Sequence, residues 1–310
     1  MSTTAAPAAA EPPTPPRPDA TPAPDPSTFI RVHTTLPRPS ALPPITARRI
    51  LTNRLVLRSA AERDLPALHV LRTQAEVMRW TARGRPDRDF EETRAWVRNW
   101  LPPSPEGKEE EEQPPSFNFV ICLRRGEGEG KVRELEGMLK SGDSGDKDGV
   151  EEEDGKRDEK VGEEEAEEGE VIGVGGCHRW KGLFGWPEVG YMIRQEVWGK
   201  GLATEFLEGW LEVWEGLERE ELEIEVDERT ILGLTEGSGK RERGGVEVVK
   251  VREQLVAITA EGNEKSQRVL GKRGFEWFTT WLADDLTQTQ REGEKKMVEL
   301  PTYRRFLEQR

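Results

Sequence analysis

A glycine-bounded turn between a short alternating run and a long amphipathic segment constrains the fold of this chain more than any other feature. The alternating run covers residues 187–193, and the turn contains Gly199 and Gly201 ahead of a helix expected over 202–218. Glycine lets the backbone approach a ligand closely. The start of a helix adds unpaired N–H groups and a partial positive charge. The segment therefore predicts a site for a phosphate or diphosphate, with an ordinary tight turn as the alternative.

Two common phosphate-binding motifs do not fit this turn. A P-loop requires Ser or Thr directly after its Gly-Lys pair, whereas Gly201 follows Lys200. A dinucleotide-binding fingerprint requires a third glycine near the position that Thr204 occupies. A different phosphate carrier must therefore be considered.

A second motif lies downstream, where an alternating run over 253–260 leads into another expected helix. Asn263 is a suitable cap for the start of that helix, and Gly274 is a suitable residue at its end. Together the two motifs resemble the GNAT superfamily of acetyl-CoA-dependent N-acetyltransferases, and in particular the branch of the ribosomal-protein N-terminal acetyltransferases. The matching pieces, in chain order, are Arg54-Leu-Val-Leu-Arg58, Arg63-Asp-Leu65, Glu188-Val-Gly-Tyr191, Trp198-Gly-Lys-Gly-Leu-Ala-Thr-Glu205 and the spaced pattern from Asn263 to Phe275.

The order of expected elements predicts an α/β fold with a mixed sheet. The resemblance implies that this sheet is mostly antiparallel, that two central strands splay apart, and that helices flank it. The expected strands are 54–58, 117–123, 171–180, 187–193, 253–260, 275–282 and 297–300. The expected helices are 64–74 (capped by Asp64), 89–101, 202–218 and 263–273.

The resemblance also implies which residues hold acetyl-CoA, the expected co-substrate. The turn would bind its diphosphate, and the backbone beside Tyr191 would run along the pantetheine arm, with one N–H polarising the thioester carbonyl. Lys200 could equally be solvated, and Asn263 and Ser266 could serve only as helix caps. The expected cofactor-binding residues are Met192, Ile193, Trp198, Gly199, Lys200, Gly201, Leu202, Ala203, Thr204, Asn263 and Ser266.

Two positions depart from the pattern of the family. Glu196 stands where many members carry Gln or Arg, which leaves one fewer cation for the phosphates. Leu270 stands where many members carry the tyrosine that protonates the departing thiolate. The acid would then be Tyr191, Ser266 or water.

Transfer to an amine also requires a base, and the first candidate is Glu188 at the start of the central strand. Burial in a cleft would raise the pKa of its carboxylate, and a surface charge is the alternative. His178 on the neighbouring strand is the second candidate, against a structural role. Cys177 and Cys122 are interpreted as buried apolar residues of a reducing compartment. The sequence contains no metal-binding motif.

Composition indicates one domain within 310 residues, because much of the chain is too polar to fold. Residues 1–44 are rich in Pro and Ala and are expected to be a disordered arm. Residues 45–310 are expected to form the domain, with low-complexity inserts at about 102–115, 124–170 and 219–252. Neither a secretion signal nor a membrane span is apparent, so we expect an intracellular protein of the cytoplasm or nucleus.

The net charge of −14 is concentrated in one insert. Residues 124–170 contain 19 acidic and 9 basic side chains. This insert is interpreted as a solvated loop, with attraction of a basic peptide as the functional alternative. The acidity argues against nucleic-acid binding.

The sequence therefore predicts an N-acetyltransferase that moves an acetyl group from acetyl-CoA to a primary amine by direct attack within a ternary complex. The acceptor would be a small amine, a protein N-terminus or a basic peptide, and the oligomeric state stays open. Two alternatives remain: a non-catalytic acyl-CoA-binding module of the same fold, and an interaction protein that uses the Pro-rich arm and the acidic insert.

Overall fold

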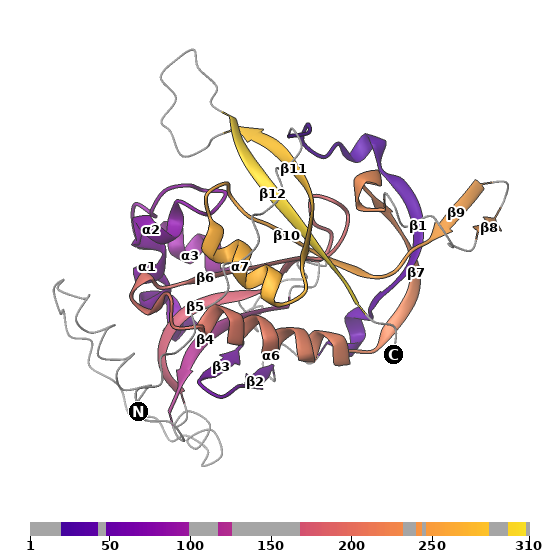
Figure 1. Ribbon diagram of the computed structural model, residues 1–310. Helices are drawn as coiled ribbons and strands as arrows, with labels where there is room; N and C mark the ends of the chain where they lie inside the picture. Colours follow the sequence, from indigo (N-terminus) through magenta and orange to yellow (C-terminus); the bar gives the residue numbers. More distant parts are fainter. Residues whose placement is uncertain are drawn as a thin grey trace, which may run out of the picture.

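Eight strands form the larger of two sheets in the computed structural model, which describes residues 20–42, 48–98, 117–125, 168–231, 240–243, 246–284 and 297–307. The strand order of the larger sheet is β11-β12-β10-β6-β5-β4-β3-β2 (Figure 1). The bounds are β2 Arg49–Leu51, β3 Leu55–Arg58, β4 Phe117–Arg124, β5 Glu168–Arg179, β6 Glu188–Ile193, β10 Gln254–Ile258, β11 Glu276–Asp284 and β12 Met297–Phe306. The predicted mixed, mostly antiparallel sheet is confirmed.

The two central strands, β6 and β10, meet at only one point within the described part of the chain. Their single parallel pair joins Glu188 to Val256, and the Val256 N–H donates to the Pro187 carbonyl at 2.9 Å. The other neighbouring strands of this sheet are antiparallel and pair over longer stretches. The ladder between β6 and β10 therefore ends at the first residue of β6 and the middle residue of β10, and the strand ends at Ile193 and Ile258 border the predicted gap.

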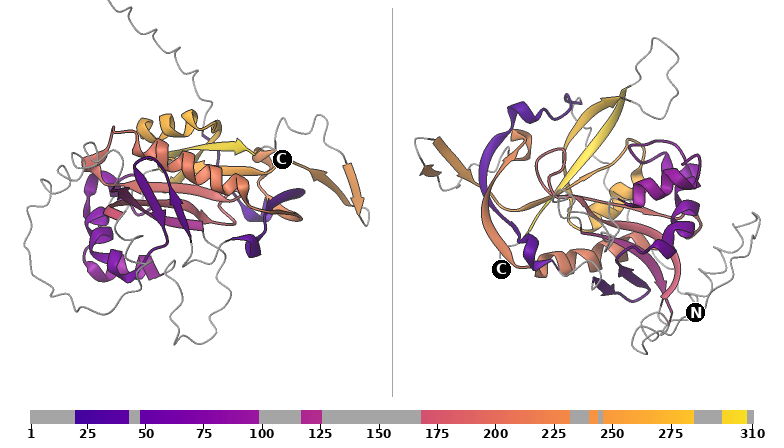
Figure 2. Two further views of the ribbon diagram at one scale, coloured as in Figure 1. Left: turned by 90° about the horizontal axis from the view of Figure 1, so that it is seen from below. Right: turned by 180° about the vertical axis from the view of Figure 1, so that it is seen from behind.

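Helices cover both faces of the larger sheet (Figure 2). Alternate residues of β4 show the division: Phe119 and Ile121 pack with α6 and α7, whereas Val120 and Cys122 pack with α1 and α3. This alternation buries both faces and makes the strands nearly continuous apolar runs. The bounds are α1 Leu65–Thr73, α2 Ala75–Met78, α3 Phe90–Arg98, α6 Leu202–Gly216 and α7 Glu264–Lys272.

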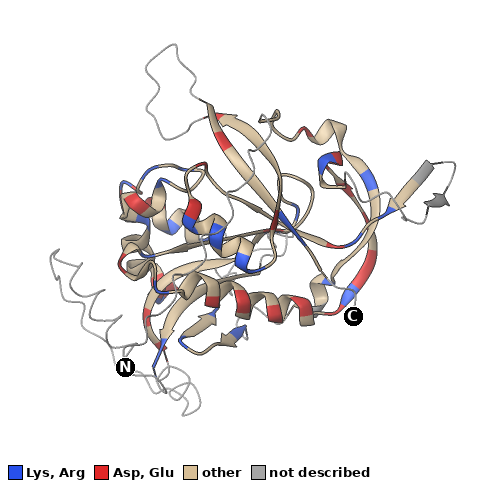
Figure 3. Ribbon diagram, viewed as in Figure 1, with Lys and Arg blue, Asp and Glu red and all other residues tan. Residues whose placement is uncertain are grey.

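The longest of these helices, α6, is strongly amphipathic. Its buried face includes Phe206 and the stacked pair Trp210 and Trp214, whose ring centroids are 5.0 Å apart. Gly209 lies where the helix passes close to the strands, because a Cβ there would stand 2.6 Å from Thr52 Cγ2. Acidic residues occupy the outer face of the helix (Figure 3). This packing fixes the N-terminus of α6 beside the end of β6.

Charged residues of the family motifs near the start of the domain bond to one another. Arg58 donates to both carboxylate oxygens of Asp64 at 2.7 Å each, and the Arg58 Nε donates to Glu168 at 2.7 Å. Asp64 also accepts from the Ala61 N–H. Asp64 occupies the predicted cap position of α1, but its carboxylate binds Arg58 and Ala61 rather than the N–H groups of the helix.

A smaller sheet with strand order β7-β1-β9-β8 corrects the prediction for the N-terminal arm. The bounds are β1 Ile30–Pro37, β7 Arg219–Val226, β8 Lys240–Arg243 and β9 Val246–Lys250. The arm was predicted to be disordered through residue 44, and this is wrong for β1, which pairs with β7 along its whole length. One face of β1 is buried, as expected for a half-buried strand in which buried and more exposed residues alternate. The buried residues are Val32, Thr34 and Leu36.

The expected insert at 219–252 supplies the other three strands of the smaller sheet. Strand β7 pairs with β1, while β8 and β9 pair with each other. The other predicted inserts, 102–115 and most of 124–170, lie outside the described residues. Among the described residues, no helix is long and apolar enough to cross a membrane.

Candidate active site

The predicted phosphate turn leaves a row of backbone donors without partners. Gly199 and Gly201 have φ angles of 75° and 79°, a left-handed conformation that glycine adopts at little cost. The first helical bond runs from the Glu205 N–H to the Gly201 carbonyl. Within the described part of the chain, the N–H groups of the six residues from Gly199 to Thr204 have no hydrogen-bond acceptor. Six successive donors at a helix N-terminus fit a diphosphate.

Trp198 attaches this turn to the end of the central strand. Its indole Nε1 donates to the Ile193 carbonyl at 2.7 Å. The ammonium of Lys265, in the first turn of α7, lies 5.1 Å from the centre of the Trp198 ring. The turn is therefore positioned from both sides, by β6 and by α7.

Along the edge of β6 next to β10, backbone groups at alternate residues have no partner in the part of the chain that the structure describes. The Arg194 N–H donates to the Ile172 carbonyl of β5 at 2.7 Å. Because hydrogen-bonded pairs alternate along an antiparallel ladder, Met192 also bonds to β5, opposite Val174. The N–H groups of Tyr191 and Ile193 then point towards the gap. Of the three backbone positions predicted to lie along pantetheine, the ladder thus favours these two over Met192.

Tyr191 and Ser266, both predicted as candidate acids, lie together across the gap. Their hydroxyl oxygens are 3.0 Å apart, and the Tyr191 ring packs edge-on against Phe206 of α6. Burial raises the pKa of Tyr191 to about 12, although the bond with Ser266 opposes the shift. The Asn263 side chain accepts from the Ser266 N–H at 3.3 Å and so caps α7. Because its pKa is raised, the Tyr191 phenol stays protonated near neutral pH.

The structure brings the two predicted base candidates into contact. The His178 Nε2 and Glu188 Oε1 atoms are 2.8 Å apart. The Leu183 N–H donates to Glu188 Oε2 at 3.2 Å, and Arg179 lies 3.7 Å from the same carboxylate. Sequence spacing could not reveal this contact, because a bulge at the end of β5 turns His178 towards Glu188.

The predicted rise in the pKa of Glu188 is wrong. Burial alone would raise the pKa of this carboxyl, which is 5% exposed. The hydrogen bond with His178, the charges of His178 and Arg179, and the Leu183 N–H together outweigh burial and lower it. Glu188 is thus held as a carboxylate and is a partner for His178 rather than a proton acceptor near neutral pH.

The two pairs of polar residues lie on opposite faces of β6. Tyr191 packs on the α6 and α7 face, whereas the His178 ring lies over Gly190 on the other face. A Cβ at Gly190 would approach the imidazole Cε1 and Nδ1 to 3.2 and 3.3 Å, so glycine makes room for the ring. The His178 side chain is 39% exposed. An acceptor molecule can therefore reach this imidazole from solvent.

Glu196 does not face the phosphate turn as an unpaired charge. It accepts from Arg194 at 2.9 Å and from the Gln74 amide at 2.9 and 2.8 Å. Burial would raise the pKa of its carboxyl, but these bonds lower it. Arg194 thus neutralises the negative charge that Glu196 introduces at this position. The bonds from Gln74 to Glu196 link the turn to the start of α2. The sequence analysis did not predict the contact of Gln74 with Glu196. It used Arg54 only as part of a family motif and did not predict the contact of Arg54 with the turn.

The cysteines have no nucleophilic character. Both are buried, and burial raises the pKa of the Cys122 thiol to about 12 and that of Cys177 further. In the described ranges, no cluster of three or more His, Cys, Asp or Glu residues could hold a metal ion.

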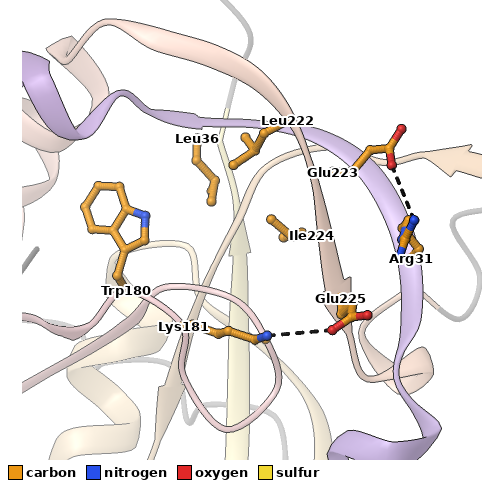
Figure 4. Close-up of a pocket in the computed structure, with 9 residues that line it drawn as sticks. Arg31, Leu36, Trp180, Lys181, Leu222, Glu223, Ile224 and Glu225 are labelled. Atoms are coloured by element: carbon orange, nitrogen blue, oxygen red, sulfur yellow. Dashed lines mark ion pairs between the residues drawn. The ribbon is translucent and has the colours of Figure 1, made fainter. Parts of the chain in front are cut away.

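A pocket of about 410 Å³ lies between the smaller sheet and the turn that joins β5 to β6 (Figure 4). Trp180, Leu36 and Ile224 supply its apolar lining. Ion pairs from Arg31 to Glu223 and from Lys181 to Glu225 stand at its rim. None of the predicted cofactor-binding residues lines it, so it is separate from the phosphate turn.

A protein-family model described as an acetyltransferase (GNAT) domain matches residues 54–276. No curated protein matches the sequence. Several solved structures are similar, including a GNAT-family acetyltransferase from Bacillus anthracis (14% identity, covering 84% of this chain and 98% of that one, TM-score 0.43). Another is the acetyltransferase from Salmonella typhimurium that modifies the N-terminal serine of ribosomal protein L7/L12 (16% identity, 84% and 100% covered, TM-score 0.44). A third is RimL, a ribosomal L7/L12 α-N-protein acetyltransferase in complex with coenzyme A (14% identity, 84% and 98% covered, TM-score 0.41).

Proposed function

This chain belongs to the GNAT family of acetyltransferases, and on that premise we propose that it transfers an acetyl group from acetyl-CoA to a primary amine by direct attack. The N–H groups of the six residues from Gly199 to Thr204, which have no acceptor among the described residues, carry the proposal. They supply the donors that a diphosphate needs, next to the strand end where β6 and β10 separate. The acceptor is a small amine or a protein N-terminus.

Acetyl-CoA supplies an activated thioester, and the backbone of β6 orients it. The Tyr191 and Ile193 N–H groups face the gap and can donate to the thioester carbonyl, where negative charge develops during attack. Lys200 and the first turn of α6 hold the phosphates. The residues proposed to bind the co-substrate are thus the predicted ones, with Met192 contributing only its position in the strand.

His178 takes the proton from the attacking amine. Its imidazole is exposed on the face of β6 that is open to an acceptor, whereas Glu188 is buried and ionised. With the Nε2 proton held by Glu188, the Nδ1 atom is an acceptor on the side of Gly190. Glu188 therefore acts through His178 by fixing its tautomer and orientation.

Tyr191 donates a proton to the departing sulfur. The new C–N bond forms as the C–S bond breaks, so the thiolate needs a proton or a hydrogen bond while the amine loses one. The phenol of Tyr191 is protonated at neutral pH and bonded to Ser266, on the face opposite His178. Proton acceptor and proton donor thus stand on either side of the reacting atoms.

The test uses the full chain with acetyl-CoA and a panel of small amines and N-terminal peptides. Release of the CoA thiol and the mass of the acetylated product are measured together. We expect turnover with at least one acceptor, and a loss of kcat of about 100-fold or more in His178→Gln. His33→Gln is the matched control, because His33 lies in the smaller sheet and pairs with Glu221. A silent panel with proven co-substrate binding would instead favour a non-catalytic acyl-CoA-binding module.

A further inference from the structure

Two carboxylates flank the phosphate turn and would repel an anion if they were unpaired. Glu196 precedes the turn, and Glu205 lies in the first turn of α6. Each carboxylate is bound by one arginine: Glu196 by Arg194 at 2.9 Å and Glu205 by Arg54 at 2.7 Å. The two arginines differ in position, because Arg194 bonds to Glu196 ahead of the turn whereas Arg54 also donates to the Lys200 carbonyl within the turn.

Arg54 is held against the turn by several bonds. Its Nε donates to Glu205 Oε2 at 2.7 Å, and its Nη1 donates to the Lys200 carbonyl at 3.0 Å. Its backbone N–H donates to Glu205 Oε1 at 2.6 Å, and the Thr52 hydroxyl donates to the same oxygen at 2.7 Å. The side chain is 24% exposed. The guanidinium is therefore fixed in orientation but still reached by solvent.

The remaining nitrogen of this guanidinium points at the start of α6. Arg54 Nη2 lies 3.6 Å from the place where a Cβ on Gly201 would stand. Among the described residues, no acceptor bonds to Nη2. Gly201 is also one of the six residues whose N–H groups have no partner. The free edge of the guanidinium and the free backbone donors thus lie at the same place.

We propose that Arg54 is a phosphate-binding residue, whose Nη2 donates to the diphosphate of coenzyme A at the turn. The inference rests on the proposed function of that turn. A planar guanidinium fixes the direction of its charge-assisted bond to a phosphate oxygen, whereas a lysine ammonium acts as a point charge on a flexible stem. Glu205 is the positioning residue that holds Arg54 in place, and Gly201 leaves the path between the guanidinium and the backbone donors open.

The charge balance around the turn supports this assignment. Among the described residues beside the turn, Arg54, Arg194, Lys200 and Lys265 are cationic and Glu196 and Glu205 are acidic. The excess of two positive charges complements a diphosphate. Arg54 thereby supplies a cation that Glu196 does not.

The test measures the dissociation constants of CoA and of 3′-dephospho-CoA by calorimetry for the wild type, Arg54→Gln, Glu205→Gln and the double variant. We expect Arg54→Gln to weaken both ligands by about tenfold or more and to the same extent. Glu205→Gln keeps one side-chain oxygen that can accept from Arg54 and removes a negative charge, so it should weaken both affinities much less than Arg54→Gln does. The double variant, which leaves no unpaired charge, should bind more weakly than Glu205→Gln alone. Melting curves confirm that each variant is folded.

Three results would overturn the inference. Arg54→Gln could leave CoA affinity unchanged. Glu205→Gln could weaken binding as much as Arg54→Gln, which would make Arg54 only a support for α6. The effect of Arg54→Gln could also vanish with 3′-dephospho-CoA, which would assign Arg54 to the 3′-phosphate and not to the diphosphate. A wild-type protein that binds neither ligand would refute the proposed function itself and not Arg54 alone.

Discussion

Replacing Tyr191 by Phe removes one oxygen atom from the gap between β6 and β10, and it tests whether that phenol has a chemical role. In the structure its hydroxyl bonds to Ser266 at 3.0 Å and the residue is buried. Ser266→Ala removes the same hydrogen bond from the other side. The two variants therefore lose one shared interaction, but only the first loses the phenol.

The two substitutions should cost similar stability and very different activity. A hydrogen bond of this kind contributes about 0.5–1.5 kcal/mol, which corresponds to a loss of roughly 1–6 °C in melting temperature for a domain of this size. If Tyr191 serves the departing sulfur, Tyr191→Phe should lower kcat by about 100-fold. Ser266→Ala should lower it by no more than about fivefold, because the phenol remains.

The assay is steady-state release of the CoA thiol at saturating acetyl-CoA, combined with thermal melting of each variant. Because the pKa of Tyr191 is raised to about 12, the wild-type kcat should show no loss from its ionisation over the usual assay range. Equal losses of kcat in both variants would show that the pair is only structural. Activity of Tyr191→Phe within about threefold of the wild type would remove Tyr191 from the mechanism.

Three further changes have defined outcomes. Glu188→Gln should lower the melting temperature at pH 7 by an amount equivalent to about 1–3 kcal/mol. Because the pKa of Glu188 is lowered in the folded protein, this difference should shrink as the pH falls below 4.5, the ordinary pKa of a glutamate. A constant difference across that range would contradict the pairing with His178. Gly201→Ala should lower the free energy of unfolding by about 1 kcal/mol, because the φ angle of Gly201 is 79°. Gly216→Ala at the other end of α6 should be neutral or stabilising in chemical denaturation. Equal costs in the two variants would refute the strain at Gly201. Trp198→Phe loses the bond to the strand end and should weaken CoA binding several-fold by calorimetry; unchanged affinity would show that the turn is held without it.

Local signals in the sequence were sufficient to predict the glycine-bounded turn and the helices on either side of it in the chain. Gly201 and Gly274 both have left-handed φ angles, and Asn263 caps α7 as its side chain suggests. Such features depend on residues that are neighbours in the chain. Seven of the eight strands of the larger sheet followed from the same local patterns, whereas β2 and α2 were not predicted.

Features that depend on distant contacts were not predicted. Strand β1 lies among prolines, and its partner β7 begins at Arg219, so nothing local to residues 30–37 indicates the pairing. The contact between His178 and Glu188 depends on a bulge in β5, and their shared environment reverses the predicted pKa shift. Arg54 reaches the turn only because β3 packs beneath the start of α6. Each of these contacts results from packing between residues that are far apart in the chain or displaced by a bulge, and the spacing of residues along the chain does not predict it.

Hydrogen exchange of the full chain with and without coenzyme A tests the central claim most directly. The N–H groups from Gly199 to Thr204 have no acceptor among the described residues, so they should exchange rapidly in the free protein. On addition of coenzyme A, peptides that cover residues 190–206 should become protected, while those of β7, which line the pocket in Figure 4, should not change. Saturating ligand that leaves residues 199–204 unprotected, or protects residues 220–226 in their place, would contradict a diphosphate site at this turn.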